Sequence, residues 1–452
     1  MQWAAFALAL LGLSEAGLLW WVSDSPVQFQ LTGVMASALA GSLAVVWTAL
    51  DKRFEKVPVG FILGLALLLR LVAVQAMPLL EDDQYRYLWD GFRTVTAFDP
   101  YRAAPSAFFD APDLAPQWQA VLSGINHPDI PTLYGPVLQY LFALAHLIAP
   151  GRIGSLQGLL LVLDMGCLLL LAKQGVAVRW LLIYAVHPML LKEAMASAHP
   201  DGLVAFWLLL AMLAWRKRWM PVVGACCALA VATKVAALVA VPLLLLHRKP
   251  AGVTAAEYRV QVVSGWGAFS AGFAVTLTAV YLPFWLTGAS EGAGLSVFAS
   301  HWRFNPLLFQ AVEAVVQGNS ARIVCGLMVL VCVAALVWRG YAATTVPRRL
   351  PPVDMALLAL LVWAPVVNPW YWLWALGPAV LAGRCAVVVA ACVGSLAYLN
   401  TTVLQQAGWS NFDLASQPFN IAWPIAAAQV IAIGVGLAVD RFPTFEITSK
   451  TR

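Results

Sequence analysis

The sequence contains few charged residues. Only 11% of its 452 residues are charged, whereas a typical soluble domain is about a quarter charged. Hydrophobic residues make up 62% of the chain, and the mean hydropathy is +0.80. Apolar runs of bilayer-spanning length recur along the whole chain, and in lipid such runs satisfy their backbone only as helices. The composition excludes an ordinary soluble domain and predicts an all-α polytopic membrane protein.

Other absences narrow the function further. The sequence has no P-loop and no Gly-rich turn between a strand and a helix, so it lacks the usual nucleotide-binding motifs. Its seven cysteines all fall inside apolar runs, without the spacing or parity of a disulfide framework or a metal site. The net charge of +5 is modest, and we expect no nucleic-acid partner. The N-terminal stretch MQWAAFALALLGL has no basic leader, so we expect a first span rather than a removed signal peptide.

Basic loops set the expected orientation. The first two spans lie near residues 3–21 and 31–50, and the loop DKRFEK follows them. Under the positive-inside rule this loop is cytoplasmic, so the third span, 57–77, runs outward. It delivers the acidic sequence LEDD to the outer face. Arg70 lies within this span and is expected either to snorkel or to face the bundle.

Residues 78–153 are predicted to form a long first outer loop. Its apolar part, 137–149, is short for a span. Asp201 lies outside if the basic sequence WRKRW is inside, which requires an even number of crossings between Asp83 and Asp201. Of the three apolar stretches in this interval, the shortest is therefore expected to be an interfacial or re-entrant helix.

The remaining apolar runs complete the predicted topology of about 12–14 transmembrane helices. We expect both termini to be cytoplasmic and divide the chain into two extra N-terminal helices (1–56), a catalytic module (57–310) and C-terminal helices (311–452). The remaining predicted spans lie near 155–172, 180–197, 201–215, 220–233, 234–246, 262–286, 320–338, 354–367, 370–383, 385–402 and 421–439.

The first outer loop opens with a dense polar sequence, LEDDQYRYLWDGF. Carboxylates at the mouth of a span are costly to desolvate, so they sit at the interface or in a polar pocket. There they can activate a nucleophile or hold a cation, and the nearby Arg86 can bind an anion such as phosphate. An interfacial belt of aromatic and charged residues is the alternative interpretation.

Further polar groups fall on the same predicted face. Asp201 can cap the following helix or serve a site, and Lys234, between two apolar halves, needs an anion or water. The aromatic side chains of NPWYWLW fit an interfacial belt better than a sugar platform. The polar groups fall in four segments of the chain, which contain Lys192, Glu193, His199 and Asp201 in the first, Thr233 and Lys234 in the second, His301, Arg303 and Asn305 in the third, and Asn368, Trp370 and Tyr371 in the fourth.

Carboxylates, an intramembrane cation and apolar walls together suit a lipid substrate with a phosphate head group. A carboxylate could take a proton from an acceptor hydroxyl, and Arg or Lys could stabilise a departing phosphate. A metal beside the paired acids is not expected, because a monophosphate leaving group beside basic residues does not require one.

The motifs EDDQYRYLWDGF, FDPYRAAP, INHPDIPTLYGP, HPMLLKE, AHPDG, TK and WRFN resemble the GT-C fold integral-membrane glycosyltransferases, over about residues 57–371. These enzymes use polyprenyl-phosphate sugars, and they include bacterial mannosyltransferase-like and dolichyl-phosphate-mannose-dependent branches. The resemblance implies that Asp82 or Asp83 is the general base, that Asp201 is the second outer acid, and that Lys234 lies near the lipid phosphate. It also implies an interfacial helix after Tyr134, but it does not explain the two spans before residue 57.

We therefore expect a hexosyltransferase whose donor is a polyprenyl-phosphate sugar with a mannose-like hexose. The acceptor is expected to be a glycan, a glycolipid or a protein. The transfer should invert the anomeric carbon and require no cofactor. Its expected location is a bacterial inner membrane, with the site facing the periplasm. The residues slightly favour Asp82 over Asp83 as the base. A transporter or flippase and a noncatalytic scaffold of polysaccharide assembly remain alternatives. The candidate residues are Asp82 and Asp83 for catalysis, Lys234, Arg86 and Arg303 for the phosphate, and His127, Tyr134, His199, Asp201, His301, Asn305, Trp370 and Tyr371 for sugar or acceptor.

Overall fold

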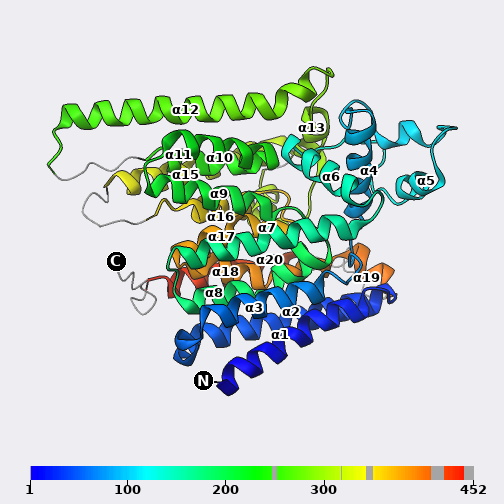
Figure 1. Cartoon of the computed structure of the whole chain (residues 1–452), viewed down its shortest axis with the longest axis horizontal. Helices are drawn as coiled ribbons and strands as arrows, with labels where there is room; N and C mark the ends of the chain where they lie inside the picture. Colours follow the sequence, from blue (N-terminus) through cyan, green and yellow to red (C-terminus); the bar gives the residue numbers. More distant parts are fainter. Residues whose placement is uncertain (1, 247–251, 317, 343–349, 409–421, 442–452) are drawn as a thin grey trace.

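A computed structural model of the chain describes residues 2–246, 252–316, 318–342, 350–408 and 422–441. In these ranges the regular elements are helices, and the only β contact is an isolated bridge between Phe304 and Val366. Most of the helices lie side by side along one direction (Figure 1). This confirms the all-α prediction. Residues 1 and 442–452, which carry the prediction for the two termini, lie outside the described residues.

Six of the described helices are long and apolar enough to cross a membrane. The protein is therefore an integral membrane protein, as its composition predicts. These helices are α1 (Gln2–Val22), α2 (Val27–Leu50), α7 (Ile153–Lys173), α12 (Ala255–Trp285), α15 (Asn319–Ala342) and α20 (Ala422–Val439).

Other apolar segments are shorter, and several are interrupted. Of the predicted pair of spans at 220–246, the first is α10, which ends before Lys234, and the second consists of two short helices, η4 and α11. Irregular backbone at membrane depth is tolerated where protein or a cavity surrounds it. The shorter elements are α3 (Val59–Ala73), α8 (Val178–Ala185), η3 (Leu190–Ala196), α9 (Gly202–Arg216), α10 (Met220–Thr233), η4 (Val235–Ala240), α11 (Val241–Leu244), α16 (Val353–Trp363), η5 (Pro369–Trp372), α17 (Leu373–Ala382), α18 (Cys385–Cys392) and η6 (Gly394–Tyr398).

A small group of helices from the predicted outer loop gathers at one end of the bundle (Figure 1). It comprises α4 (Asp83–Thr96), η2 (Pro105–Phe108), α5 (Pro116–Ser123) and α6 (Pro136–Ile148). Trp89 and Trp118 belong to a small hydrophobic core of its own. Helices α4 and α6 cross closely at Gly91, where a Cβ atom would lie 2.5 Å from the carbonyl oxygen of Phe142.

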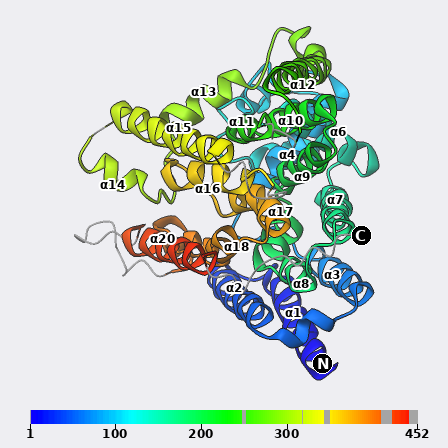
Figure 2. The same ribbon diagram turned by 90° about the vertical axis from the view of Figure 1, so that its left-hand side faces the viewer.

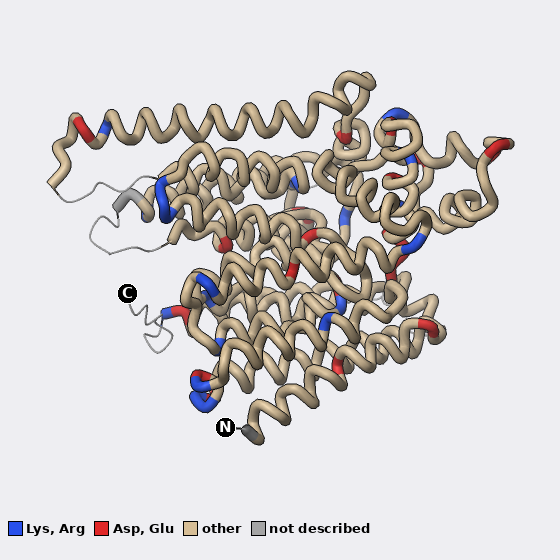
Figure 3. The backbone as a smooth tube through the Cα atoms, viewed as in Figure 1, with Lys and Arg blue, Asp and Glu red and all other residues tan. Residues whose placement is uncertain are grey.

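Charged residues are distributed unevenly between the two ends. Lys and Arg gather where α2 joins α3, α7 joins α8 and α9 joins α10, at the end opposite the α4–α6 group (Figure 3). Viewed from one end, α1–α3 lie on one side of the bundle and α10 and α12 on the other (Figure 2). One hydrophobic core nevertheless runs from Ala4 to Ile433, so the first two helices are part of the same packed body. The remaining described helices are η1 (Lys52–Lys56), α13 (Gly292–His301), α14 (Phe309–Glu313) and α19 (Thr401–Gln406).

Arg70 faces the bundle and does not snorkel. Its side chain is fully buried, and its Nε lies 2.6 Å from Asp164 Oδ2 on α7. Arg70 also donates to the carbonyl oxygen of Ala185 at 2.6 Å, while the Tyr184 hydroxyl donates to Asp164 Oδ1 at 2.7 Å. This ion pair joins α3, α7 and α8. Because both charges are desolvated, removing either one leaves the other without compensation.

Candidate active site

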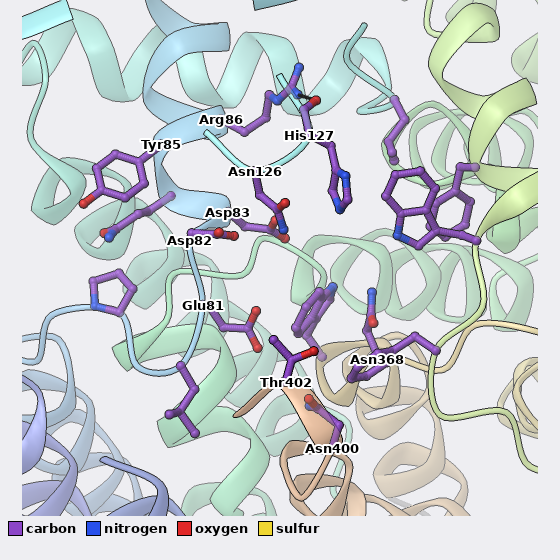
Figure 4. Close-up of a pocket in the computed structure, with 18 of the residues that line it drawn as sticks. Glu81, Asp82, Asp83, Tyr85, Arg86, Asn126, His127, Asn368, Asn400 and Thr402 are labelled. Carbon is purple, nitrogen blue, oxygen red and sulfur yellow. Dashed lines mark hydrogen bonds between the residues drawn. The ribbon is translucent and has the colours of Figure 1, made fainter. Parts of the chain in front are cut away.

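A cavity of about 930 Å³ lies beneath the α4–α6 group. Its walls come from the start of α4, the segment 126–134, Lys234, the end of α13, η5 and the segment 398–406. Figure 4 shows Asp82 and Asp83 near Asn126, Glu81 near Thr402, and Asn368 and Asn400 across from the two aspartates. The predicted site residues that line the cavity are Asp82, Asp83, Arg86, His127, Tyr134, Lys234, Arg303, Trp370 and Tyr371.

The backbone before α4 turns the acids into the cavity. Leu80 has a left-handed backbone (φ 60°), and its N–H donates to Gln30 Oε1 of α2 at 3.1 Å. Asp82 then occupies the N-cap position without a side-chain capping bond, and Asp83 is the first residue of α4. The second helix of the chain thus helps to position the acidic motif.

Two tyrosine hydroxyls hold Asp83. Tyr87 and Tyr134 both donate to its Oδ2, at 3.4 and 3.3 Å. Burial raises the pKa of Asp83, and the nearby Lys234 ammonium opposes that shift. Burial also raises the pKa of Asp82, and the adjacent negative charge of Asp83 adds to it. Both carboxyls are therefore better proton acceptors than an exposed aspartate.

Lys234 sits where α10 breaks. Its backbone is extended (φ −145°, ψ 124°), and its side chain is 10% exposed. The Nζ atom lies 3.7 Å from Asp201 Oδ1 and 4.8 Å from the ring centroid of Tyr134. Gly135 lets the outer loop approach this break, because a Cβ atom there would lie 2.1 Å from the carbonyl oxygen of Ala232. The lysine therefore presents its charge at the cavity wall.

Asp201 contacts Lys234 but does not line the cavity. It precedes α9 but makes no side-chain capping bond, so the capping interpretation does not hold. Its Oδ1 instead accepts a hydrogen bond from Trp374 Nε1 at 2.6 Å. Within the described part of the chain its Oδ2 is buried without a hydrogen-bond partner. Asp201 thus acts as a buried counterion to the lysine rather than as part of the cavity surface.

A second polar cluster lies deeper. Glu193 Oε2 is 3.2 Å from Lys192 Nζ and 3.6 Å from His199 Nε2. The Tyr398 hydroxyl donates to Glu193 at 3.1 Å and is hydrogen-bonded to Lys192. His199 stacks on the cavity residue Trp370 with 3.8 Å between ring centroids. All four members of the cluster are buried.

Several predicted residues have partners within the protein. Arg86 donates to the carbonyl oxygens of Ile130 and His127 at 3.0 and 3.1 Å, so it fixes the loop above the cavity. Arg303 is half exposed and pairs with Glu313 at 2.5 Å.

His301 and Asn305 lie outside the cavity lining. His301 is exposed, and the Asn305 amide donates to the carbonyl oxygen of Val367 at 3.1 Å.

The site also contains residues that the sequence did not identify. Tyr398, Asn400 and Thr402 come from the C-terminal part of the chain, which was predicted as a plain span, and Asn126 comes from the outer loop. The available signal was the polar sequence NTT directly after an apolar run.

The arrangement provides a lysine for an anion and two carboxyls that can accept a proton, facing one space. Among the described residues, no group of three or more His, Cys, Asp or Glu side chains could hold a metal ion.

No protein-family model matches the chain, and comparison with curated proteins and with solved structures likewise gives no match.

Proposed function

We propose that this protein is a membrane glycosyltransferase that transfers a hexose from a polyprenyl monophosphate to an acceptor hydroxyl. The observation that carries the proposal is that Lys234 and Asp83 line one cavity within an apolar bundle, near enough for the lysine to lower the pKa of the carboxyl. A lysine here can bind a phosphate monoester, and a nearby carboxylate can take the proton of an attacking alcohol.

The donor phosphate is assigned to Lys234. The ammonium of Lys234 lies near the carboxylates of Asp201 and Asp83. A bound phosphate adds a third anionic partner, and the rings of Tyr134 and Tyr371 stabilise the cation from its sides. As the bond between the sugar and the phosphate breaks, negative charge grows on the phosphate, and Lys234 stabilises that charge.

Asp83 is assigned as the general base. Tyr87 and Tyr134 hold its Oδ2, which fixes the orientation of the carboxylate. The acceptor oxygen attacks the anomeric carbon, its proton passes to Asp83, and the polyprenyl phosphate leaves with the bonding electrons, so the anomeric configuration inverts. The sequence slightly favoured Asp82, but Asp83 accepts from two tyrosine hydroxyls and is influenced by the Lys234 ammonium.

The wider architecture of the proposal is a GT-C-like bundle of about 12–14 transmembrane helices in a bacterial inner membrane. The basic connections at one end and the cavity at the other support a cytoplasmic and a periplasmic face, respectively. Both termini are placed on the cytoplasmic side. Glycan, glycolipid or protein acceptors would enter from the periplasm.

The test is turnover by purified protein with a panel of polyprenyl-phosphate hexoses, including mannose and glucose. Asp83→Asn should lower turnover by about 100-fold or more while polyprenyl-phosphate binding survives. Asp82→Asn serves as the matched control and should retain most activity. Lys234→Ala should weaken the binding of undecaprenyl phosphate.

Two results would contradict this assignment. If Asp82→Asn abolishes turnover and Asp83→Asn does not, the roles of the two acids are exchanged. If neither variant changes turnover, the enzymatic role of this loop fails. Movement of a lipid or sugar across vesicles without transfer would instead support the transporter or flippase alternative.

A further inference from the structure

A line of polar side chains, most of them buried, leads away from Asp83 into the bundle. The Tyr87 hydroxyl contacts Asp83 Oδ2 at 3.4 Å and His199 Nδ1 at 2.9 Å. His199 Nε2 has no hydrogen-bond partner among the described residues and lies 3.6 Å from Glu193 Oε2. A small approach of these two groups would form a hydrogen bond between them.

The line returns to the cavity at a different carboxyl. Glu193 accepts the Tyr398 hydroxyl at 3.1 Å, and the same hydroxyl lies close enough to Glu81 to lower the pKa of that carboxyl. Glu81 lines the cavity, and burial raises its pKa well above the ordinary range, opposed by Lys192. The two ends of the line are thus Asp83 and Glu81, both at the cavity surface.

The direction in which hydrogens pass along the line depends on which atom donates in the contact between Tyr87 and His199. Tyr87 has one hydroxyl hydrogen, so when Asp83 is protonated and donates to the Tyr87 oxygen, that hydrogen is directed to His199 Nδ1. The imidazole hydrogen then sits on Nε2 and points toward Glu193. Burial and the ammonium groups of Lys192 and Lys234 lower the pKa of His199 well below its usual value, so the ring is neutral. A neutral imidazole can accept a hydrogen at one nitrogen while it donates from the other.

We propose that Tyr87, His199, Glu193 and Tyr398 form a proton relay that carries the proton taken up by Asp83 to Glu81. In the first half, Asp83 gives its hydrogen to Tyr87, Tyr87 gives its own to His199 Nδ1, and His199 gives the Nε2 hydrogen to Glu193. In the second half, Glu193 gives the hydrogen to Tyr398 and Tyr398 gives its own to Glu81. One proton leaves Asp83 and one arrives at Glu81, and no other group gains or loses charge.

The pairing of Glu193 with Lys192 explains why the proton does not stop halfway. A protonated Glu193 would leave the Lys192 ammonium buried without its counterion, which is costly. Glu81 is more exposed than Glu193, because Glu81 is half-buried and Glu193 is fully buried. The relay therefore restores Asp83 while products still occupy the cavity beside it.

The inference rests on the proposed transfer reaction, and a matched pair of variants separates the two. Tyr87→Phe and Tyr134→Phe each remove one hydroxyl that donates to the same oxygen of Asp83, and each keeps the aromatic ring. Only Tyr87 touches His199. The measurement compares the first turnover with the steady-state rate, using the polyprenyl-phosphate hexose from the panel that the wild-type protein uses fastest.

We expect both variants to slow the first turnover by a similar factor. Tyr87→Phe alone should slow the steady-state rate about tenfold more than it slows the first turnover. Equal losses in the two phases for both variants would overturn the relay and leave Tyr87 as a positioning residue. If Tyr87→Phe does not fold, the solvent deuterium isotope effect of the wild-type protein provides the test. The relay requires this effect to be larger on the steady-state rate than on the first turnover. A wild-type protein that is inactive with every donor in the panel would instead overturn the proposed function.

Discussion

Asp90 of α4 gives a quantitative test of the outer-loop structure, because it is buried in the motif WDG and titrates near neutral pH. Its side chain is 1% exposed, and Oδ2 accepts hydrogen bonds from Thr132 at 2.5 Å and from Gln139 at 2.9 Å. Burial raises the pKa of Asp90 to about 6, and the charge of Arg86 and the two hydrogen bonds oppose that shift. The carboxyl supports Thr132, which lines the cavity.

The sign of the effect follows from the raised pKa. Unfolded aspartate titrates near 3.9, so above about pH 4 the unfolded chain releases a proton that the folded chain retains. The contribution of Asp90 to the free energy of unfolding is therefore greatest below about pH 4, and it is lost as the pH rises through about 6. A shift of about two units corresponds to about 3 kcal/mol of stability lost by pH 8.

Asp90→Asn removes the titration and keeps one oxygen that can accept both hydrogen bonds. Relative to wild type, its free energy of unfolding should gain about 3 kcal/mol between about pH 4 and about pH 8. Thermal unfolding in detergent over this range measures the difference. Asp113→Asn, at an exposed position of the same loop, serves as the control for the loss of one carboxyl. A constant difference between wild type and Asp90→Asn would refute this explanation.

Three further predictions concern the bundle, the cation site and the topology. Arg70→Met should lower the free energy of unfolding by about 3–5 kcal/mol, because it leaves Asp164 buried without its partner; thermal unfolding measures this, and a loss below about 1 kcal/mol would contradict it. Gly135→Ala should weaken undecaprenyl-phosphate binding by about tenfold, because the new Cβ would displace the end of α10 beside Lys234. Gly158→Ala has open space at that position and should bind normally. An impermeant thiol reagent applied from outside should label a cysteine at Ala111 and not one at Lys217, and labelling of both would overturn the predicted sidedness.

The helices could be predicted from apolar runs, and so could the break at Lys234 between 220–233 and 234–246, but the other interruptions could not. The predicted span 180–197 is α8 followed by the π-helical turn η3, with His187 and Pro188 between them. The predicted span 385–402 likewise breaks after α18. Gly394 marks that break, where a Cβ atom would lie 2.5 Å from Met189 Cε. Such a break depends on a neighbour about two hundred residues away, which periodicity in one segment does not reveal.

The polar wall of the cavity could be predicted in part. Charged residues are rare in the apolar segments and costly in lipid, so Asp83 and Lys234 were expected to face one site. Tyr398 and Asn400 were not expected, because neither is charged and their segment is otherwise apolar. Charge alone also could not show that Arg86 is bonded to backbone carbonyls, since its partners come from a loop more than forty residues later.

The helix interruptions and the site coincide, and one physical cause explains both. Lys234 ends α10, Glu193 lies in the π-helical turn, Trp370 lies in η5 and Tyr398 ends η6. A broken helix exposes backbone groups that lipid cannot satisfy, so it is tolerated only where protein or a polar cavity supplies partners. A long apolar run that contains a lone polar or charged residue beside a proline, glycine or threonine therefore indicates a site as well as a span. The sequences ATKV, NPWYW and GSLAYLN each carry that signal in this chain.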